Sequence, residues 1–311
     1  MMLDTILGNA QVVDDLRTAL RADRLVHSVL LCGEAGTGTG YAARCLAADY
    51  LYPNADTDKT AAEGAAQVMA NESPEYLVLS GEGVSGDIKI DAVRAVRRAV
   101  FNTSLSARGR VVHLSGADHL NTASANALLK VLEEPPEGVL FLLTAPGEAG
   151  ILPTIRSRCA CYSLAPVSEA VCAHYLEQRF AAMPNAKRQS AEYAALFGGK
   201  IGSGVRCFTD AGARAQLDAA KQLADAVQAK EPYLALCLLA KYEKDRTAAR
   251  SVLSLLCAVC AAALRGAYPV PAAPLAAAAI SAVQKADARL AGNGNAKLVL
   301  TCLAGDLTPD A

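Results

Sequence analysis

The stretch from Arg110 to Cys159 constrains the fold of this chain more than any other part of it. It begins with an apolar run, Val111–Leu114, which is typical of a buried strand. Apolar residues then recur at i, i+3, i+4 and i+7 on one face of a predicted helix: Ala125, Leu128, Leu129 and Leu132. A second apolar run, Val139–Thr144, predicts the next buried strand. The segment is therefore a strand–helix–strand unit, as found in parallel sheets.

The boundaries of this unit are marked by polar residues and prolines. Asn121 or Thr122 can cap the start of the helix by accepting a hydrogen bond from a backbone N–H of its first turn. Pro135 and Pro136 must end the helix, because proline has no N–H to donate. After the second strand the segment closes on the polar residues Thr154–Cys159, which include two arginines.

Composition limits the class of protein. A chain of 311 residues has room for two or three domains of roughly 100–150 residues each. Hydrophobic residues make up 52% and aromatics only 5%, with no Trp, so Ala, Leu and Val carry the core, which favours packed helices over a β-sandwich. The net charge of -1 argues against a protein that binds nucleic acid alone, because such proteins are usually basic.

Cysteine usage predicts reduced thiols, no metal site and a cytoplasmic location. Six of the ten cysteines are scattered singly among apolar residues: Cys32, Cys45, Cys172, Cys207, Cys237 and Cys302. The close pairs, Cys159/Cys161 and Cys257/Cys260, lack the second pair of ligands that a zinc site needs. The N-terminus has no basic segment of a secretory signal. The longest apolar run, Ser251–Leu264, is shorter than the ~20 residues needed to span a bilayer, which predicts a packed helix.

A glycine-rich loop lies between a predicted strand, 27–32, and a predicted helix, 41–51, the context of a phosphate-binding loop. In the pattern G-x-x-x-x-G-K-[ST], Gly33 and Gly38 occupy the glycine positions, with Gly36 between them. Thr39 replaces the lysine that neutralises the outer phosphates, and Gly40 replaces the hydroxyl that holds magnesium. The loop keeps the glycines but lacks the lysine and the magnesium-binding hydroxyl. The simplest interpretation is a turn that never binds nucleotide.

A dinucleotide-binding loop is the rival interpretation, because 38–43 also satisfies G-x-G-x-x-[GA]. That site requires a strand ending in Asp or Glu about 20 residues later. Residues 53–70 are instead polar, rich in alanine and without a strand pattern, which disfavours a dinucleotide-dependent enzyme.

The chain resembles the AAA+ clamp-loader subunits, most closely the delta-prime branch of bacterial DNA polymerase III. The resemblance is firmest at Ala117-Asp118, Asn126–Pro136 and Pro153–Cys159, and it extends more faintly over nearly the whole chain. It implies an α/β P-loop (AAA+) domain with a parallel sheet and a degenerate site over 1–164, a small helical lid over 165–208 and an all-α collar domain for oligomerisation over 209–311.

Compared with the ATP-hydrolysing members of this family, the chain lacks further site residues. Ser115 and Gly116 stand where those members carry an acidic pair, which holds magnesium and polarises the attacking water. Asp118 matches a later aspartate, too far along to replace either. Residues 198–204 resemble a glycine turn of the lid, and Ser203 stands where a nucleotide-sensing arginine is frequent. The resemblance therefore implies a subunit that does not hydrolyse ATP.

The Ser157-Arg158-Cys159 motif is intact, and by resemblance Arg158 is an arginine finger that contacts the γ-phosphate bound by a neighbouring subunit. A guanidinium suits this role because it is always charged and donates two hydrogen bonds to phosphate oxygens. The competing interpretation is an internal salt bridge. Arg156 is expected to be structural.

Three arginines, Arg94, Arg97 and Arg98, share one face of a helix predicted from Ala92 to Phe101. They could contact DNA phosphates, as the resemblance implies, or form a solvated basic face or inter-subunit salt bridges. Related proteins carry a cysteine-ligated zinc module after the glycine-loop helix, but residues 53–73 contain no cysteine, so a structural insertion without zinc is expected.

The resemblance as a whole implies a role in DNA replication: a delta-prime-like subunit of the DNA polymerase III clamp loader that scaffolds the ring and supplies the trans arginine. Expected partners are the ATPase (tau/gamma-type) and delta-type clamp-loader subunits, with the sliding clamp and primed DNA reached through the complex, and no membrane. We expect no productively bound ATP, Mg²⁺ or zinc. The alternative is an active AAA+ ATPase of the same family.

Overall fold

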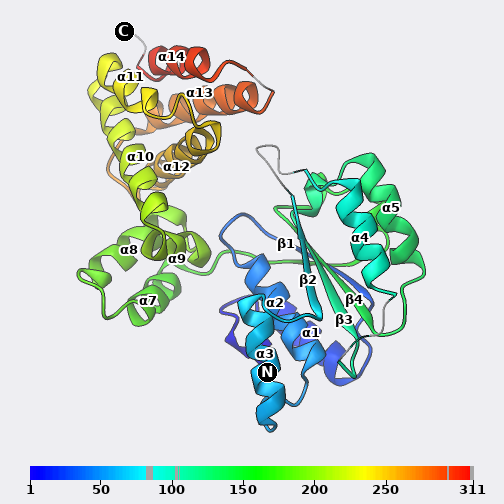
Figure 1. The fold of residues 1–311 in the computed structure, drawn as a ribbon. Helices are drawn as coiled ribbons and strands as arrows, with labels where there is room; N and C mark the ends of the chain where they lie inside the picture. Colours follow the sequence, from blue (N-terminus) through cyan, green and yellow to red (C-terminus); the bar gives the residue numbers. More distant parts are fainter. Residues whose placement is uncertain (82–86, 102–103, 105, 293, 309–311) are drawn as a thin grey trace. The chain divides into compact units, whose positions relative to one another are not determined.

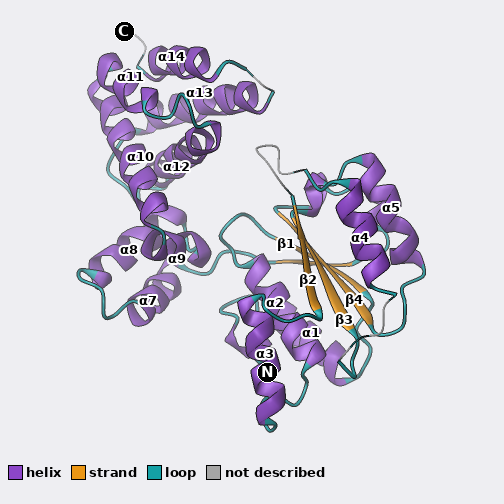
Figure 2. Cartoon of the chain, viewed as in Figure 1, coloured by secondary structure: helices purple, strands orange, loops and turns teal. Residues whose placement is uncertain are grey.

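The computed structural model describes the chain except residues 82–86, 102–103, 105, 293 and 309–311 (Figure 1). The chain divides into two compact units, Met1–Val167 and Ser168–Ala311. The first unit combines a sheet with helices, and the second is helical in the residues described (Figure 2).

A five-stranded parallel sheet forms the centre of the first unit. Its strands are β1 (Ser28–Cys32), β2 (Tyr76–Ser80), β3 (Arg110–Ser115), β4 (Val139–Ala145) and β5 (Ala160–Ser163). They are ordered β2-β3-β4-β1-β5, and all pairs are parallel. Every residue of β1 and β4 is buried, as expected for central strands covered on both faces.

Helices cover both faces of this sheet. On one face lie α1 (Ala10–Arg21), α2 (Thr39–Leu51) and α3 (Lys59–Ala70), whose apolar residues share a core with Val29, Leu31, Val111, Leu140 and Leu142. On the other face lie α4 (Ile90–Ala99), α5 (Thr122–Glu133) and the short α6 (Pro153–Arg156), packed on Leu30, Val112, Leu114, Phe141 and Leu143 (Figure 1). Alternate residues of β1, β3 and β4 therefore contribute to two separate cores.

Three short 3-10 helices complete the first unit: η1 (Met2–Thr5), η2 (Ala117–His119) and η3 (Glu148–Gly150). The strand–helix–strand unit at 110–145 is confirmed, and Asn121 is the residue that caps α5, because its side chain accepts from Ser124 N at 2.8 Å. The edge strand β5 was not predicted. It is four residues long and only partly buried, so it has no apolar run.

The insertion at 53–73 contains α3, capped by Asp58, whose carboxylate accepts hydrogen bonds from Thr60 N and Ala61 N. This helix packs on α2 at a close approach, because a Cβ built on Gly64 would lie 2.4 Å from ring atoms of Tyr52. The segment is thus part of the core of the first unit.

The second unit contains eight helices in its described residues: α7 (Glu169–Arg179), α8 (Ala186–Phe197), α9 (Ile201–Thr209), α10 (Ala211–Ala229), α11 (Pro232–Ala240), α12 (Arg246–Leu264), α13 (Ala273–Ala291) and α14 (Ala296–Leu307). The expected α/β first part and helical second part are confirmed. By length and composition alone α12 could cross a membrane. It packs against α10 and α13, and its buried face has the period of a core helix.

One prediction in this unit was wrong. The glycine-rich residues 198–204 were expected to form a turn, but α9 begins at Ile201 and contains Ser203 and Gly204. Gly204 packs closely on α7, since a Cβ there would lie 2.6 Å from Leu176 Cδ1. A small residue lets the two helices approach, and local sequence does not reveal that contact.

Candidate functional site

The glycine loop lies at the carboxyl end of β1, where it leads into α2. Gly36 and Gly38 have φ of 90° and 100°, values that side-chain-bearing residues rarely adopt, and Gly38 is the N-cap of α2. The first turn of α2 therefore begins at the carboxyl edge of the sheet, in the position of a phosphate-binding loop.

Side chains of the loop itself pack against its first glycine. A Cβ built on Gly33 would lie 2.6 Å from Thr37 Oγ1 and 3.0 Å from Thr39 Cγ2. The Thr37 hydroxyl donates to Glu34 O at 2.8 Å. Thr39, at the lysine position of the pattern, thus places a methyl group against Gly33 and brings no charge to the loop. Gly40 has nothing within 4 Å of a built Cβ.

The carboxyl end of β3 has no acidic side chain directly after it. Ser115 pairs with Thr144 in the sheet register, and Gly116 donates its backbone N–H to Thr144 O at 3.0 Å. Asp118 follows in η2, with Oδ1 buried and without a hydrogen-bond partner among the described residues. Ser115 and Gly116 therefore occupy the strand end that would face a nucleotide in a working ATPase.

Negative charge is nevertheless present near the end of β1. Burial, followed by the charges of Glu148, Cys161 and Asp118, raises the pKa of the Cys32 thiol to about 11. The two carboxylates are those of Asp118 in η2, which follows β3, and Glu148 in η3, which follows β4. Glu148 also lies 3.9 Å from Arg156, so this charge is partly balanced by an arginine.

A buried polar chain lies beneath this edge. Tyr76 Oη and His113 Nδ1 are 2.7 Å apart, and His113 Nε2 lies 3.2 Å from Thr144 Oγ1. Burial, reinforced by the charge of Arg44, lowers the pKa of His113 to about 4. The imidazole is therefore neutral at physiological pH, and the chain links β2, β3 and β4 by side-chain hydrogen bonds.

Arg158 lies directly after α6, in the turn before β5. Its Nη1 donates to Thr154 O at 2.8 Å, and its Nη2 donates to Glu133 Oε1 at 2.5 Å. The side chain remains 35% exposed. The structure thus contains the internal salt bridge that was the competing interpretation of this residue, and it leaves about a third of the side chain exposed.

Arg156, the other arginine of this motif, is 48% exposed and lies 3.9 Å from Glu148 Oε2 through Nη1. It has no other ion pair among the described residues. Its long contact fits a surface role.

The three arginines of α4 lie on its outer face. Arg94, Arg97 and Arg98 are exposed, while Val93 of the same helix is buried. Arg94 forms a 3.4 Å ion pair with Asp91, and within the described part of the chain Arg97 and Arg98 have none. The sequence-based expectation that they share a face is confirmed. Whether the face meets DNA stays a prediction.

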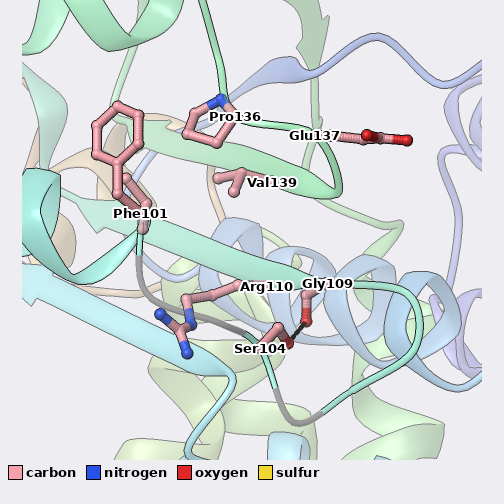
Figure 3. Close-up of a pocket in the computed structure, with 8 residues that line it drawn as sticks. Phe101, Ser104, Gly109, Arg110, Pro136, Glu137 and Val139 are labelled. Atoms are coloured by element: carbon pink, nitrogen blue, oxygen red, sulfur yellow. Dashed lines mark hydrogen bonds between the residues drawn. The ribbon is translucent and has the colours of Figure 1, made fainter.

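A pocket of about 250 Å³ lies elsewhere, at the amino ends of β3 and β4 (Figure 3). Figure 3 shows Phe101, Pro136 and Val139 on one side of it and Arg110 on the other. The Arg110 side chain is 11% exposed, and its Nε donates to the buried Glu75 at 2.7 Å. This ion pair gives Arg110 a structural role at the amino end of β3. This pocket is at the opposite edge of the sheet from the glycine loop.

All ten cysteines are free. In the described ranges no group of three or more His, Cys, Asp or Glu could hold a metal ion.

Sequence reasoning missed three residues of this region: Glu133, His113 and Thr144. Glu133 was noted only as part of a motif, and its pairing with Arg158 joins residues 25 positions apart. His113 sits inside an apolar run, which is a detectable signal for a buried polar chain, because a lone imidazole in a strand core needs partners.

Comparison with known proteins gives consistent matches. Residues 8–168 match the family model described as "DNA polymerase III, delta subunit". The protein is 34% identical to "DNA polymerase III subunit delta'" of Haemophilus influenzae over 158 residues, which are 50% of this chain and 47% of that protein. It is 32% identical to "DNA polymerase III subunit gamma/tau" of Mycobacterium bovis over 155 residues, 49% of this chain and 27% of that protein. These alignments span about half the length of such curated relatives or less.

The likeness in fold extends further along the chain. A solved structure, the gamma subunit-related protein of DNA polymerase III from Thermotoga maritima, superposes with a TM-score of 0.54 and 17% identity. The superposition covers 94% of this chain and 98% of that one. It supports a shared fold of sheet unit and helical unit.

Proposed function

The chain belongs to the DNA polymerase III delta-subunit family, and we propose that it is a delta-prime-type clamp-loader subunit that does not hydrolyse ATP itself. In this proposal it scaffolds the loader ring in the cytoplasm and supplies Arg158 to the ATP site of a neighbouring subunit. Its partners are tau/gamma-type and delta-type subunits, and it acts on the sliding clamp and primed DNA through the assembled complex. In this proposal the lid is 165–208 and the collar is 209–311, which together comprise the second unit and the three residues before it.

The observation that carries this proposal is a pair of contrasting sites on one sheet. The glycine loop has Thr39 and Gly40 where a phosphoryl-transfer site needs a lysine and a hydroxyl, and β3 ends in Ser115. Arg158 lies on a separate turn, and its side chain is 35% exposed. Because lysine, metal ligand and carboxylate act as a unit in phosphoryl transfer, restoring one of them would not restore turnover.

The exposed Arg94, Arg97 and Arg98 support a contribution to DNA contacts within the ring. Phosphate contacts of this kind are sequence-independent and weaken with salt. The near-neutral chain fits a subunit whose DNA contacts are local and shared with partners.

Substitution of Arg158 in the assembled loader tests the proposal. We expect Arg158→Ala to leave assembly intact and to lower turnover at the neighbouring ATP site by roughly 10³-fold, because trans arginine fingers contribute roughly 10³–10⁵ in rate. The measurement is single-turnover ATP hydrolysis together with clamp loading. Arg156→Ala is the matched control, since Arg156 is in the same motif, is exposed and has only a 3.9 Å contact.

Unchanged hydrolysis and loading by the Arg158→Ala complex would contradict the proposal. The alternative, an active ATPase, is separated by titrating MgATP into the isolated chain: heat of binding with turnover would favour it.

A further inference from the structure

The guanidinium of Arg158 is held by acceptors of its own chain. Nη2 donates to Glu133 Oε1 at 2.5 Å, while Nη1 donates to Thr154 O at 2.8 Å and to Ser157 Oγ at 3.3 Å. Glu133 is the last residue of α5, and Thr154 is in α6. The contact with Glu133 is therefore the one that ties the guanidinium to a long helix packed on the sheet.

These contacts use Nη1 and Nη2 and leave the third nitrogen of the guanidinium unused. A guanidinium has five N–H donors in a fixed fork. Within the described residues Nε–H has no hydrogen-bond partner, and the side chain is 35% exposed. Donors not used by Glu133, Thr154 and Ser157 therefore remain for phosphate oxygens.

An unrestrained arginine samples many rotamers, and fixing it on a phosphate costs conformational entropy. A charge-assisted hydrogen bond to a residue on a rigid helix removes much of that cost beforehand. Glu133 also brings a negative charge, which opposes an approaching phosphate. At an exposed pair this charge effect is small and screened, so the positional effect should dominate.

We propose that Glu133 is a positioning residue for Arg158, holding its guanidinium at the end of α5 for the phosphate of a nucleotide bound to a neighbouring subunit. The inference rests on the proposed function of Arg158. Glu133 does not itself touch the nucleotide.

The test compares assembled loaders containing wild-type chain, Glu133→Ala, Glu133→Gln, Arg158→Ala and the double variant Glu133→Ala/Arg158→Ala. Glu134→Ala is the matched control, because Glu134 is exposed, adjacent and has no ion pair in the part of the chain that is described. Single-turnover hydrolysis is measured against ATP concentration. We expect Glu133→Ala to lower the maximal rate of hydrolysis by about tenfold. This is less than the ~10²-fold loss of rate that a misplaced catalytic group can cause.

The conservative variant and the double variant sharpen this result. Glu133→Gln keeps an oxygen acceptor, and we expect it to recover most of the rate. The double variant should be no slower than Arg158→Ala, because a positioning residue has no effect once its target is absent. The half-saturating ATP concentration should not change, since Glu133 does not bind the nucleotide.

A second measurement uses the isolated full-length chain and does not depend on assembly. Modification of Arg158 by phenylglyoxal, followed by mass spectrometry, should be faster in Glu133→Ala than in wild type, and unchanged in Glu134→Ala. Equal modification, or a Glu133→Ala loader as fast as wild type while Arg158→Ala is slow, overturns this inference and leaves the proposed function standing. An Arg158→Ala loader as fast as wild type overturns both.

Discussion

His113 shows how a single residue can couple the stability of the first unit to pH. Its ring lies in the sheet between Tyr76 and Thr144 and is 4% exposed. Burial lowers its pKa to about 4, below the 6.5 of an unperturbed imidazole. Above pH 6.5 both folded and unfolded chains are neutral here, so the full stability is present. As the pH falls from 6.5 toward 4, the unfolded chain takes up a proton that the folded chain does not.

We therefore predict that the free energy of unfolding of the first unit decreases by about 3 kcal/mol between pH 6.5 and pH 4 from this residue alone, and not further below pH 4. His113→Gln should flatten this part of the profile. Urea unfolding followed by circular dichroism at several pH values measures it. His119→Gln is the comparison for loss of an exposed histidine, because the His119 side chain is 48% exposed. An identical slope in His113→Gln and wild type would contradict the prediction.

The other decisive residue is Arg158. Its motif predicted a functional arginine, and the alternatives were a trans contact or an internal salt bridge. The structure contains the salt bridge to Glu133 and leaves the Arg158 side chain 35% exposed, and the trans contact stays a prediction. Local sequence could not identify Glu133 as the partner, because the pairing depends on how α5 and α6 pack.

At the scale of elements, α3 illustrates how an insertion becomes part of a core. Residues 53–73 were expected to be structural and without zinc, and they form a capped helix on α2. A Cβ on Gly64 would lie 2.4 Å from the ring of Tyr52, the residue that follows α2, so glycine permits this close approach. Such a contact depends on how two segments pack, so the sequence of either segment alone does not predict it.

We predict that Gly64→Ala destabilises the first unit by about 1–3 kcal/mol, because the added Cβ would lie 2.4 Å from the Tyr52 ring and overpacking forces neighbours to move. Thermal unfolding of the full chain measures the change. Gly40→Ala is the matched control in α2: its Cβ meets nothing within 4 Å, so replacing a helical glycine there should stabilise by up to about 1 kcal/mol. A Gly64→Ala protein as stable as wild type would show that α2 and α3 are not held at this spacing.

At the scale of the whole molecule, the chain is two compact units that meet in sequence at 167/168. The predicted boundary of the first domain at 164/165 lies close to this point. The predicted boundary at 208/209 falls inside the second unit, before the last residue of α9. Arg265, after α12, donates to Ala195 O at 3.0 Å and to Leu196 O at 3.3 Å, at the end of α8. The helices assigned to lid and collar are thus joined by direct hydrogen bonds.

We expect limited digestion with a protease of broad specificity to cut first at the exposed residues near Pro166 and Ser168. Two fragments should persist, one ending and the other beginning near residue 167. Each should have its own cooperative unfolding transition, because each unit has its own core. Mass spectrometry locates the cut, and calorimetry follows the fragments. A first cut near 208 would instead indicate that lid and collar are separate domains.

The sequence by itself determined the elements whose causes are local. Strands at 28–32 and 139–145 follow from apolar runs, α5 follows from its 3.6-residue period with Asn121 before it and Pro135 after it, and the altered glycine loop is visible at Thr39 and Gly40. These signals depend on neighbours within a few positions. Tertiary structure alone decided the edge strand β5, the helical state of 201–204 and the partner of Arg158. Each of these involves contacts between residues distant in sequence: the pairing of β5 with β1, the close packing of Gly204 on Leu176, and the hydrogen bond from Arg158 to Glu133.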